Sequence, residues 1–346
     1  MLAGCRSTTS KGARTLKQTC SSNLQLIHFD PESETSISTA VQVIREKLTK
    51  DANDNLRRSE RRKSRTAGML WGIANTHGRM HVGDVELTNL SLAQEQLNAN
   101  TLATLRVTQA FLPFLKESRG RVVNLSASAA TLPRPGLGSY SMTLKAVENM
   151  THVLRQEMKK WGVDVCLVRS GTLFNDAYDS SHAQGRRISA VWNAMDEKLR
   201  ESYGVEYLES LNRGILQEGP KSVVDYNPCS SSASMALFSK HPRPVYHADS
   251  FLHILVRKCV KLLPSCIRDV VVTWIRRRDE DADAIPKALV GCSETGCSHS
   301  APHEALENLK GIFNKFSHQY YGQNGFGGDF FARYLRHRAN DRTMCN

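Results

Sequence analysis

The segment from Gly120 to Lys145 constrains the fold of this chain more than any other, because it changes from strand to helix within a short distance. It begins with a run of β-favouring residues, Arg121 to Leu125, which predicts a strand. A turn-rich, serine-containing loop follows, and a helical pattern opens at Ser139-Tyr140. In open α/β sheets, ligands bind at the carboxyl ends of the strands. This order therefore predicts an α/β protein with a site that includes Tyr140.

Further strand and helix patterns alternate along the chain. Short β-rich runs occur at residues 24–29, 163–168 and 243–248, and long helical patterns occur at 35–50, 92–116, 145–161 and 251–263. This alternation predicts a doubly wound parallel sheet of the Rossmann type, with helices on both faces. Residues 182–211 and 221–239 have helical patterns with little strand character, which predicts a helical lobe.

The net charge of the chain is +12, from 46 basic and 34 acidic residues. Part of the excess is local, because residues 57–65, RRSERRKSR, carry six basic side chains. We interpret this run as a solvated loop within an insertion at residues 51–69, and we expect no nucleic acid partner. With 40% hydrophobic and 23% charged residues, the composition is typical of a globular protein.

Nine cysteines are scattered along the chain without the dense spacing of a secreted disulfide framework, so we expect a reducing, intracellular compartment. Cys292, Cys297, His299 and His303 are close in sequence, but their spacing does not match a zinc site, and we predict no metal. The sequence contains no apolar run long enough for a transmembrane helix, and its start has no signal peptide pattern. No targeting signal is visible.

The strand, loop and helix around Tyr140 resemble the catalytic segment of the short-chain dehydrogenase/reductase family. The resemblance is strongest to the branch with D-β-hydroxybutyrate, retinol and 17β-hydroxysteroid dehydrogenases. In that family a loop serine precedes the catalytic tyrosine, and a lysine follows it by one helical turn. Here the serine position is Ala127, flanked by Ser126, and the lysine position is Leu144, followed by Lys145. The resemblance therefore implies a catalytic site changed at two of its working positions.

The resemblance also implies a role for each candidate catalytic residue, namely Tyr140, Asn100, Lys145 and Ser126. The tyrosine passes a proton, the lysine lowers the pKa of the tyrosine, and the serine hydroxyl holds the substrate oxygen. Asn100 matches an asparagine that anchors a water in the family's proton relay, or it is a tolerated polar residue in a helix. Lys145 is rotated by roughly 100° about the helix axis from the usual lysine position.

The family uses NAD or NADP, so the resemblance implies a nicotinamide cofactor. The candidate cofactor-binding residues are Asp30, Asn75, Gly78, Gly171, Thr172 and Arg6. Residues 2–5 match the second strand of the family, and the first strand with its Gly-rich loop is absent from this sequence. Either a leading segment is missing or the protein lacks ordinary cofactor binding. Arg6, just past residues 2–5, agrees with a 2′-phosphate and hence with NADP.

Two candidate positions keep alternative interpretations. Asp30 either contacts the adenine ring or is a carboxylate favoured by the dipole at a helix start. In Asn75-Thr76-His77-Gly78, where relatives carry Asn-Asn-Ala-Gly, only the first and last residues match. His77 is either a ligand contact or a loop histidine that replaces a small residue.

The resemblance covers residues 1–275 as one domain, with a substrate lobe at 176–240 and an amphipathic helix at 249–263. Residues 276–346 are expected to be a tail of low order and unknown role. The basic amphipathic helix fits either a membrane surface or packing on the lobe. By resemblance, the partners are a small lipophilic or short hydroxy-acid substrate, a membrane of the mitochondrion or endoplasmic reticulum, and a second copy of the chain.

Two functions follow from the same residues. The first is a dehydrogenase/reductase that acts on a secondary alcohol or ketone, with a rate reduced by Ala127 and Leu144. The second is a catalytically inactive relative that serves as a binding or interaction module. The pair Ala127 and Leu144 favours the second hypothesis, and Tyr140 favours the first.

Overall fold

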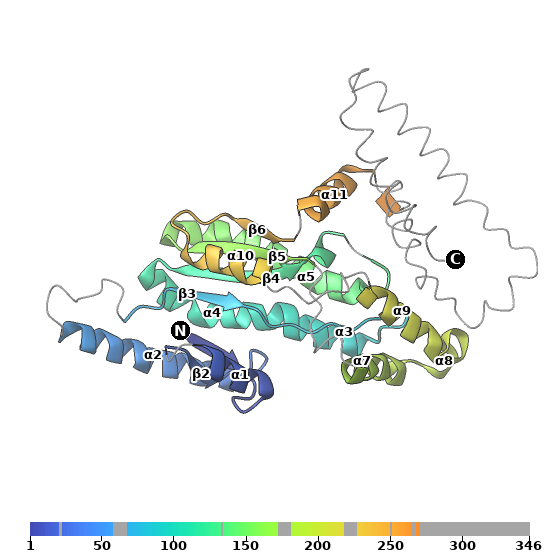
Figure 1. Cartoon of the computed structure of the whole chain (residues 1–346), viewed down its shortest axis with the longest axis horizontal. Coiled ribbons are helices and arrows are strands. Elements are labelled where there is room, and N and C mark those ends of the chain that lie inside the picture. The colour runs from blue at the N-terminus through green and yellow to red at the C-terminus, as the bar shows by residue number, and fades with distance from the viewer. Residues whose placement is uncertain are drawn as a thin grey trace, which may run out of the picture.

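The computed structural model describes residues 1–20, 23–57, 68–132, 134–171, 181–217, 227–249, 251–264 and 268–269. Four parallel strands form its main sheet. The strands are β3 (Gly72–Asn75), β4 (Arg121–Ala127), β5 (Asp164–Ser170) and β6 (Val245–Ala248), in that spatial order (Figure 1). β4 and β5 are the central pair, and their apolar residues are almost completely buried. Continuous apolar runs are expected in parallel strands that are covered on both faces.

A second parallel sheet consists of β1 (Leu2–Cys5) and β2 (Gln25–His28), which are linked through α1 (Lys11–Thr19). In the described part of the chain, the hydrogen-bonded ladder does not continue from β1 to β3. Instead the two sheets share one apolar layer, in which residues of β1, β2 and β3 pack with α2 (Glu34–Leu56) and α4 (Ala103–Ser118). The prediction of a Rossmann-like parallel sheet with flanking helices is confirmed, and the sheet is divided between β1 and β3.

Helices cover both faces of the main sheet. Successive residues of a strand point to opposite faces. Ser126 of β4 hydrogen-bonds α5 (Gly138–Met158), whereas Val123 of β4 packs in a cluster with α10 (Asn227–Phe238). α5 and α10 therefore lie on opposite faces, as a doubly wound sheet requires.

The helix predicted at residues 92–116 is α3 (Leu90–Leu97) and α4, joined by a π-helical turn at Asn98–Leu102. π-helical turns inside α-helices are rare and are frequent at functional sites. This turn contains Asn100, one of the candidate catalytic residues.

A lobe of three helices, α7 (Ser181–Ala194), α8 (Glu197–Tyr203) and α9 (Val205–Gln217), lies at the end of the molecule away from β1 and β2 (Figure 1). The sequence pattern predicts continuous helix over most of this range, but the helix is broken before α8 and again at Gly204. Gly204 has a φ of +77° and a ψ of 158°, a backbone conformation open almost only to glycine, and it ends α8.

The end predicted for the helix at residues 35–50 differs from the structure. α2 continues to Leu56 instead of ending at Lys50, so the predicted insertion at residues 51–69 begins inside a helix. The chain returns closely against this extra turn, because a Cβ placed on Gly68 would lie 2.6 Å from the Cβ of Ala52. The predicted C-terminal helix is present as α11 (Phe251–Leu262). The predicted tail, residues 276–346, lies outside the described residues.

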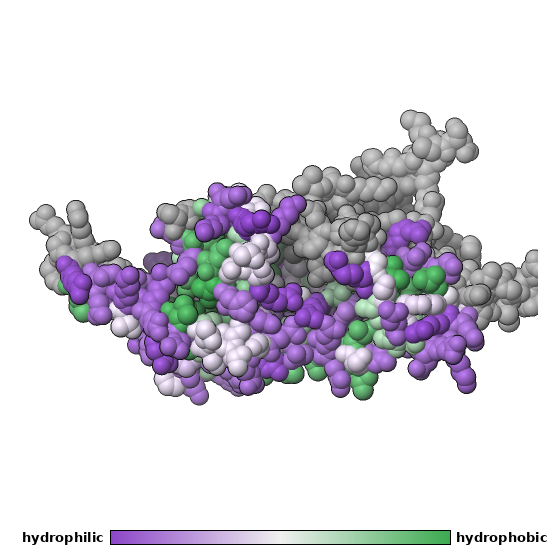
Figure 2. All heavy atoms as spheres, turned by 90° about the horizontal axis from the view of Figure 1, so that it is seen from below, coloured by the Kyte–Doolittle hydropathy of each residue, from purple (hydrophilic) through white to green (hydrophobic). Residues whose placement is uncertain are grey.

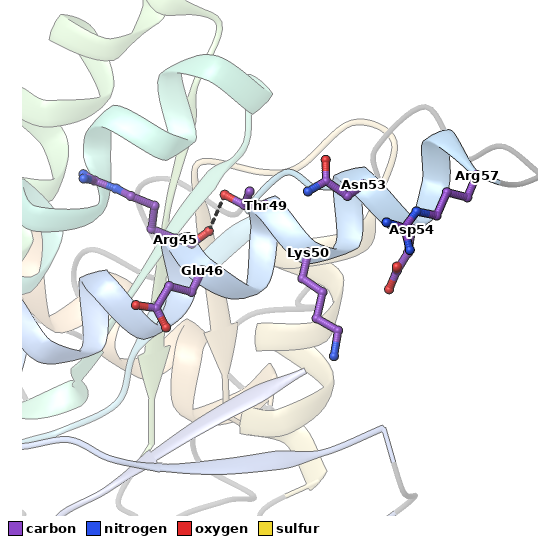
Figure 3. Close-up of a pocket in the computed structure, with 7 residues that line it drawn as sticks. All are labelled: Arg45, Glu46, Thr49, Lys50, Asn53, Asp54 and Arg57. Carbon is purple, nitrogen blue, oxygen red and sulfur yellow. Dashed lines mark hydrogen bonds between the residues drawn. The ribbon is translucent and has the colours of Figure 1, made fainter.

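The outer side of α2 is polar. A shallow hollow along it is lined by Arg45, Glu46, Thr49, Lys50, Asn53, Asp54 and Arg57 (Figure 3). Charges of both signs alternate there, and the Thr49 hydroxyl donates to the backbone oxygen of Arg45 at 3.0 Å. Viewed from below, the molecule is mainly hydrophilic, with hydrophobic groups in separate areas (Figure 2). We interpret the hollow as a solvated helix face.

Candidate functional site

Tyr140 lies in the first turn of α5 and packs against an apolar cluster between the sheet and the helical lobe. The cluster consists of Val82, Leu87, Ala129, Ala130, Leu137, Leu144, Val191, Met195, Tyr207, Leu208 and Leu211. Ala127, the last residue of β4, packs against the same cluster, and Leu144 is buried in it with 7% of its surface exposed. The fold therefore brings together the serine, tyrosine and lysine positions of the resembled family, and two of the three side chains are apolar.

Lys145 and Ser126 both bind Glu148, a buried residue two turns after Tyr140 on α5. The Lys145 Nζ lies 3.6 Å from Oε2 of Glu148, and the Ser126 hydroxyl donates to Oε1 at 3.2 Å. Arg169 of β5 donates to the same Oε1 at 2.7 Å. The two candidate catalytic groups are thus held by a carboxylate that the sequence analysis did not select. The signal for it was its position three residues after Lys145 on one helix face.

Ser126, Arg169 and His247 form a polar row across the ends of β4, β5 and β6. Burial lowers the pKa of His247 below 6.5, and the cations Arg169, Lys258 and Arg257 lower it further, while Glu148 raises it. These surroundings therefore favour the neutral form of the His247 imidazole.

Asn100 connects a loop to the first turn of α5. Its Oδ1 accepts from the backbone N–H of Arg79 at 2.6 Å, and its Nδ2 donates to the backbone oxygen of Arg79 at 2.9 Å and to Oγ1 of Thr143 at 2.8 Å. The Thr143 hydroxyl in turn donates to the backbone oxygen of Tyr140 at 2.8 Å. Asn100 therefore reaches the turn that carries Tyr140 through Thr143, a residue that sequence patterns did not identify.

Asn75 of β3 connects this strand to β4 and α4 through side-chain hydrogen bonds. Its Nδ2 donates to Oδ1 of Asn124 at 2.8 Å and to Oγ1 of Thr108 at 3.1 Å, and the amide is buried. Gly78, three residues later, lies so close to Asn100 that an added Cβ would be 3.1 Å from its Oδ1. Both residues have a packing role at the positions that the resemblance assigns to the cofactor.

Arg6 and His77 lie at the ends of β1 and β3, where the sheet is divided. Burial lowers the pKa of His77 to about 4, and the charge of Arg6 contributes to this shift. The Nε2 of His77 is 3.2 Å from Oγ1 of Thr104 in α4. Arg6 is exposed and has no acidic partner within the described part of the chain.

The remaining candidate cofactor contacts are distributed over other loops. The Oδ1 of Asp30 accepts from the backbone N–H of Glu32 at 3.0 Å, just before α2 begins. Gly171 follows β5, and an added Cβ there would lie 2.8 Å from the carboxyl carbon of Asp249. Thr172 lies outside the described residues. Of the six predicted contacts, Arg6, Asp30, Gly78 and Gly171 follow the carboxyl ends of strands and Asn75 is the last residue of β3.

The chemistry at these strand ends fits a nucleotide. Among the described residues Arg6 has no acidic partner, and its guanidinium is suited to a phosphate, whereas the neutral imidazole of His77 is suited to a hydroxyl or amino group. Tyr140 lies in the first turn of α5, the helix that follows β4. Arg6, His77 and Tyr140 therefore follow three different strands.

The described residues contain no cluster of three side chains that could hold a metal ion. The cysteine and histidine group at residues 292–303 lies outside them. None of the helices in the described part of the chain is both long and apolar enough to cross a membrane.

Comparisons with known proteins identify relatives along most of the chain. Similarity extends to 11-beta-hydroxysteroid dehydrogenase type 2 of Oryctolagus cuniculus, which is 29% identical over 238 residues, or 68% of this chain and 54% of that protein. The chain thus spans about half the length of that relative. D-beta-hydroxybutyrate dehydrogenase, mitochondrial, of Bos taurus is 27% identical over 275 residues, which cover 78% of this chain and 75% of that protein.

A solved structure has the same fold. A short-chain dehydrogenase from Streptomyces avermitilis superposes with a TM-score of 0.53 and 18% identity, over 80% of this chain and 88% of that one. The family model described as short chain dehydrogenase matches residues 2–184, which include β1 to β5 and Tyr140. This chain therefore belongs to the short-chain dehydrogenase family.

Proposed function

We propose that this protein is an oxidoreductase that interconverts a secondary alcohol and a ketone with NAD or NADP. The observation that carries the proposal is the position of Tyr140, at the start of α5, beside the end of β4 and against an apolar cluster. The relatives' names refer to steroid and hydroxybutyrate substrates. The apolar surroundings of Tyr140 favour a lipophilic substrate over a short hydroxy acid.

The proposed proton transfer uses the Tyr140 hydroxyl. As the alcohol becomes a ketone, the phenolate oxygen takes the hydroxyl proton, and in the reverse direction the phenol returns it. A bound nicotinamide supplies the hydride acceptor or donor. Asn100 and Thr143 hold the backbone of this turn and thereby orient Tyr140.

The expected rate is low for two reasons. A tyrosine with a pKa of about 10 is a poor base at neutral pH unless a cation stabilises its phenolate. Leu144 provides no charge, and the ammonium of Lys145 is paired with Glu148. Ala127 also removes a hydroxyl donor to the substrate oxygen, which is an interaction of about 3 kcal/mol in the transition state.

A second candidate is a catalytically inactive relative that binds a nucleotide or a partner. The burial of Leu144 favours it, because this side chain completes the apolar cluster where the family has a lysine. The structural part of the site is then retained and the proton-transfer chemistry is lost.

Cofactor-dependent turnover separates the two candidates. Purified chain is incubated with NAD or NADP and with steroid, retinoid and hydroxybutyrate alcohols, and reduced cofactor is followed by absorbance. The dehydrogenase proposal expects slow turnover that Tyr140→Phe abolishes while nucleotide affinity stays unchanged. Nucleotide binding without turnover in either protein supports the inactive relative, and turnover that survives Tyr140→Phe contradicts the proposed role of Tyr140.

We also propose that α11 contacts a membrane surface. Phe251, Leu255 and Leu262 are 80%, 41% and 86% exposed, and Lys258 and Lys261 on the same helix are exposed as well. Exposed apolar residues beside lysines are typical of helices that lie in the interface of anionic membranes. This contact agrees with association with a mitochondrial or endoplasmic reticulum membrane.

A further inference from the structure

Hydrogen bonds hold the helical lobe against the start of α5. The Tyr207 hydroxyl of α9 donates to the carboxylate of Asp84. The backbone N–H of Gly83, the residue before Asp84, donates to the backbone oxygen of Gly136 at 2.9 Å, two residues before α5 begins. This loop therefore connects α9 to the turn that carries Tyr140, and it fixes the position of α9 relative to that turn.

α9 presents one face to the apolar cluster around Tyr140. Tyr207, Leu208 and Leu211 of α9 belong to this cluster. Asn212 follows Leu208 by four positions, so the two side chains lie on the same face of the helix. Asn212 is only 2% exposed. The lobe therefore buries a polar side chain on the side of α9 that packs against the cluster.

The Oδ1 atom of Asn212 is buried and has no hydrogen-bond partner in the part of the chain that the structure describes. Burying an amide oxygen without a hydrogen bond is unfavourable, so nearly all buried polar atoms have a partner. Gln96 of α3 is also fully buried, and its Oε1 has no partner among the described residues. Its Nε2, however, donates to Oγ of Ser139 at 2.9 Å, and this support of the start of α5 accounts for Gln96.

The surroundings of the Asn212 oxygen define the ligand that matches it. An asparagine Oδ1 only accepts hydrogen bonds, so the matching group is a donor such as a hydroxyl. The side chains of the cluster are apolar, so the rest of the ligand is lipophilic. Small-molecule sites are typically lined in this way, with a few polar groups that fix the orientation of the ligand.

We propose that Asn212 is a specificity-determining residue whose Oδ1 accepts a hydrogen bond from a second hydroxyl of the substrate, remote from the alcohol carbon that reacts at Tyr140. The substrate is then a lipophilic diol. This inference rests on the proposed function, because Tyr140 defines the reacting end. It also explains why the lobe keeps a buried oxygen without a partner, since the ligand supplies the donor.

Binding of two steroids that differ only in the second hydroxyl tests this assignment. Estradiol has a hydroxyl at the opposite end of its ring system from the 17-hydroxyl, and 3-deoxyestradiol lacks it. In calorimetric titrations of the full chain, estradiol is expected to bind about tenfold more tightly than 3-deoxyestradiol, as for one hydrogen bond. Asn212→Leu should bring the two affinities within about twofold of each other. Asn193→Leu, the same exchange at an exposed position of α7, is the control and should keep the preference.

Thermal unfolding without ligand gives a second readout. Because Asn212→Leu removes a buried oxygen without a partner, it should raise the unfolding midpoint by about 3 °C, whereas Asn193→Leu should change it by less than about 1 °C. A residue with only a structural role would lower the midpoint when it is replaced. A lower midpoint in Asn212→Leu would therefore overturn the inference.

The binding results separate this inference from the proposed function. Equal affinities of the two steroids in the unaltered chain, a preference that survives in Asn212→Leu, or absence of binding by both steroids would each overturn the role of Asn212. Alcohol turnover that depends on Tyr140 would support the proposed function in all three cases. Conversely, the expected preference without any turnover supports Asn212 as a ligand contact and contradicts the proposed function.

Discussion

At the scale of single residues, the titration of His77 makes the free energy of unfolding depend on pH. Its pKa falls from 6.5 to about 4 on folding, first because of burial and then because of Arg6. Between these values the unfolded chain binds more protons than the folded one, so stability decreases as the pH falls through this window. Below it the loss reaches roughly 3 kcal/mol.

We predict that His77→Gln flattens this part of the stability profile. Urea unfolding measured at several pH values between 4 and 7 gives the slope for both proteins. Thr104 keeps a partner in the glutamine variant, so the comparison isolates the titration of the ring. Equal slopes of stability against pH in the two proteins would contradict the lowered pKa of His77.

Glu148 is the second residue whose surroundings predict a measurable effect. Glu148→Gln removes the negative charge that pairs with the largely buried guanidinium of Arg169. This loss is expected to destabilise the fold by about 3 kcal/mol. Lys145→Met is the matched control, because the Lys145 side chain is 60% exposed and its pair with Glu148 contributes less than about 1 kcal/mol. Chemical denaturation of both variants gives the two values, and equal losses would show that Arg169 does not depend on Glu148.

The resemblance to the family selected Tyr140 and Asn100 as candidates, but it did not reveal the residues that surround them. The pairing of Glu148 with Arg169 joins two residues on different elements, and no local pattern encodes it. No local pattern encodes the hydrogen bond between Thr104 and His77 either, and Thr104 also bonds the backbone oxygen of Asn100. The roles of Tyr140, Lys145, Ser126 and the cofactor contacts remain predictions.

At the scale of elements, we predict that substituting two glycines of the lobe by alanine changes stability in opposite directions. Gly204 ends α8 with a φ of +77° and a ψ of 158°, so Gly204→Ala should destabilise the protein by about 1–3 kcal/mol. Gly185 lies within α7, and an added Cβ meets no atom within 4 Å. Gly185→Ala should therefore stabilise by about 0.5–1 kcal/mol. Thermal unfolding monitored by circular dichroism measures both changes, and a common sign for the two variants would contradict the assigned conformations.

Elements with strong local signals were predictable. The strands predicted at residues 121–125 and 163–168 contain β-branched apolar residues, and the structure has them as β4 (Arg121–Ala127) and β5 (Asp164–Ser170). The extension of α2 brings Ala52 against Gly68, and no local pattern encodes this contact. The π-helical turn at Asn98–Leu102 carries Asn100, whose hydrogen bonds reach other segments and are likewise not encoded locally.

At the scale of the whole molecule, α11 predicts binding to anionic vesicles. Phe251→Ser combined with Leu262→Ser should reduce co-sedimentation with phosphatidylserine-containing vesicles by about tenfold, because each removes exposed apolar area from the interface. Val85→Ser, which alters an exposed apolar residue outside α11, is the control. Equal binding by all three proteins would exclude α11 as the contact.

Under the proposed function, the Tyr140 site is a dehydrogenase site weakened at Ala127 and Leu144. The decisive measurement of this proposal is kcat/KM for alcohol oxidation in the variant Ala127→Ser/Leu144→Lys, with Ala127→Ser alone as the less disruptive form and circular dichroism to establish folding. We expect an increase of at least about 100-fold over the unaltered chain, which is lost again when Tyr140→Phe is added. A folded double variant without any gain, or a gain that persists without the tyrosine hydroxyl, would contradict it.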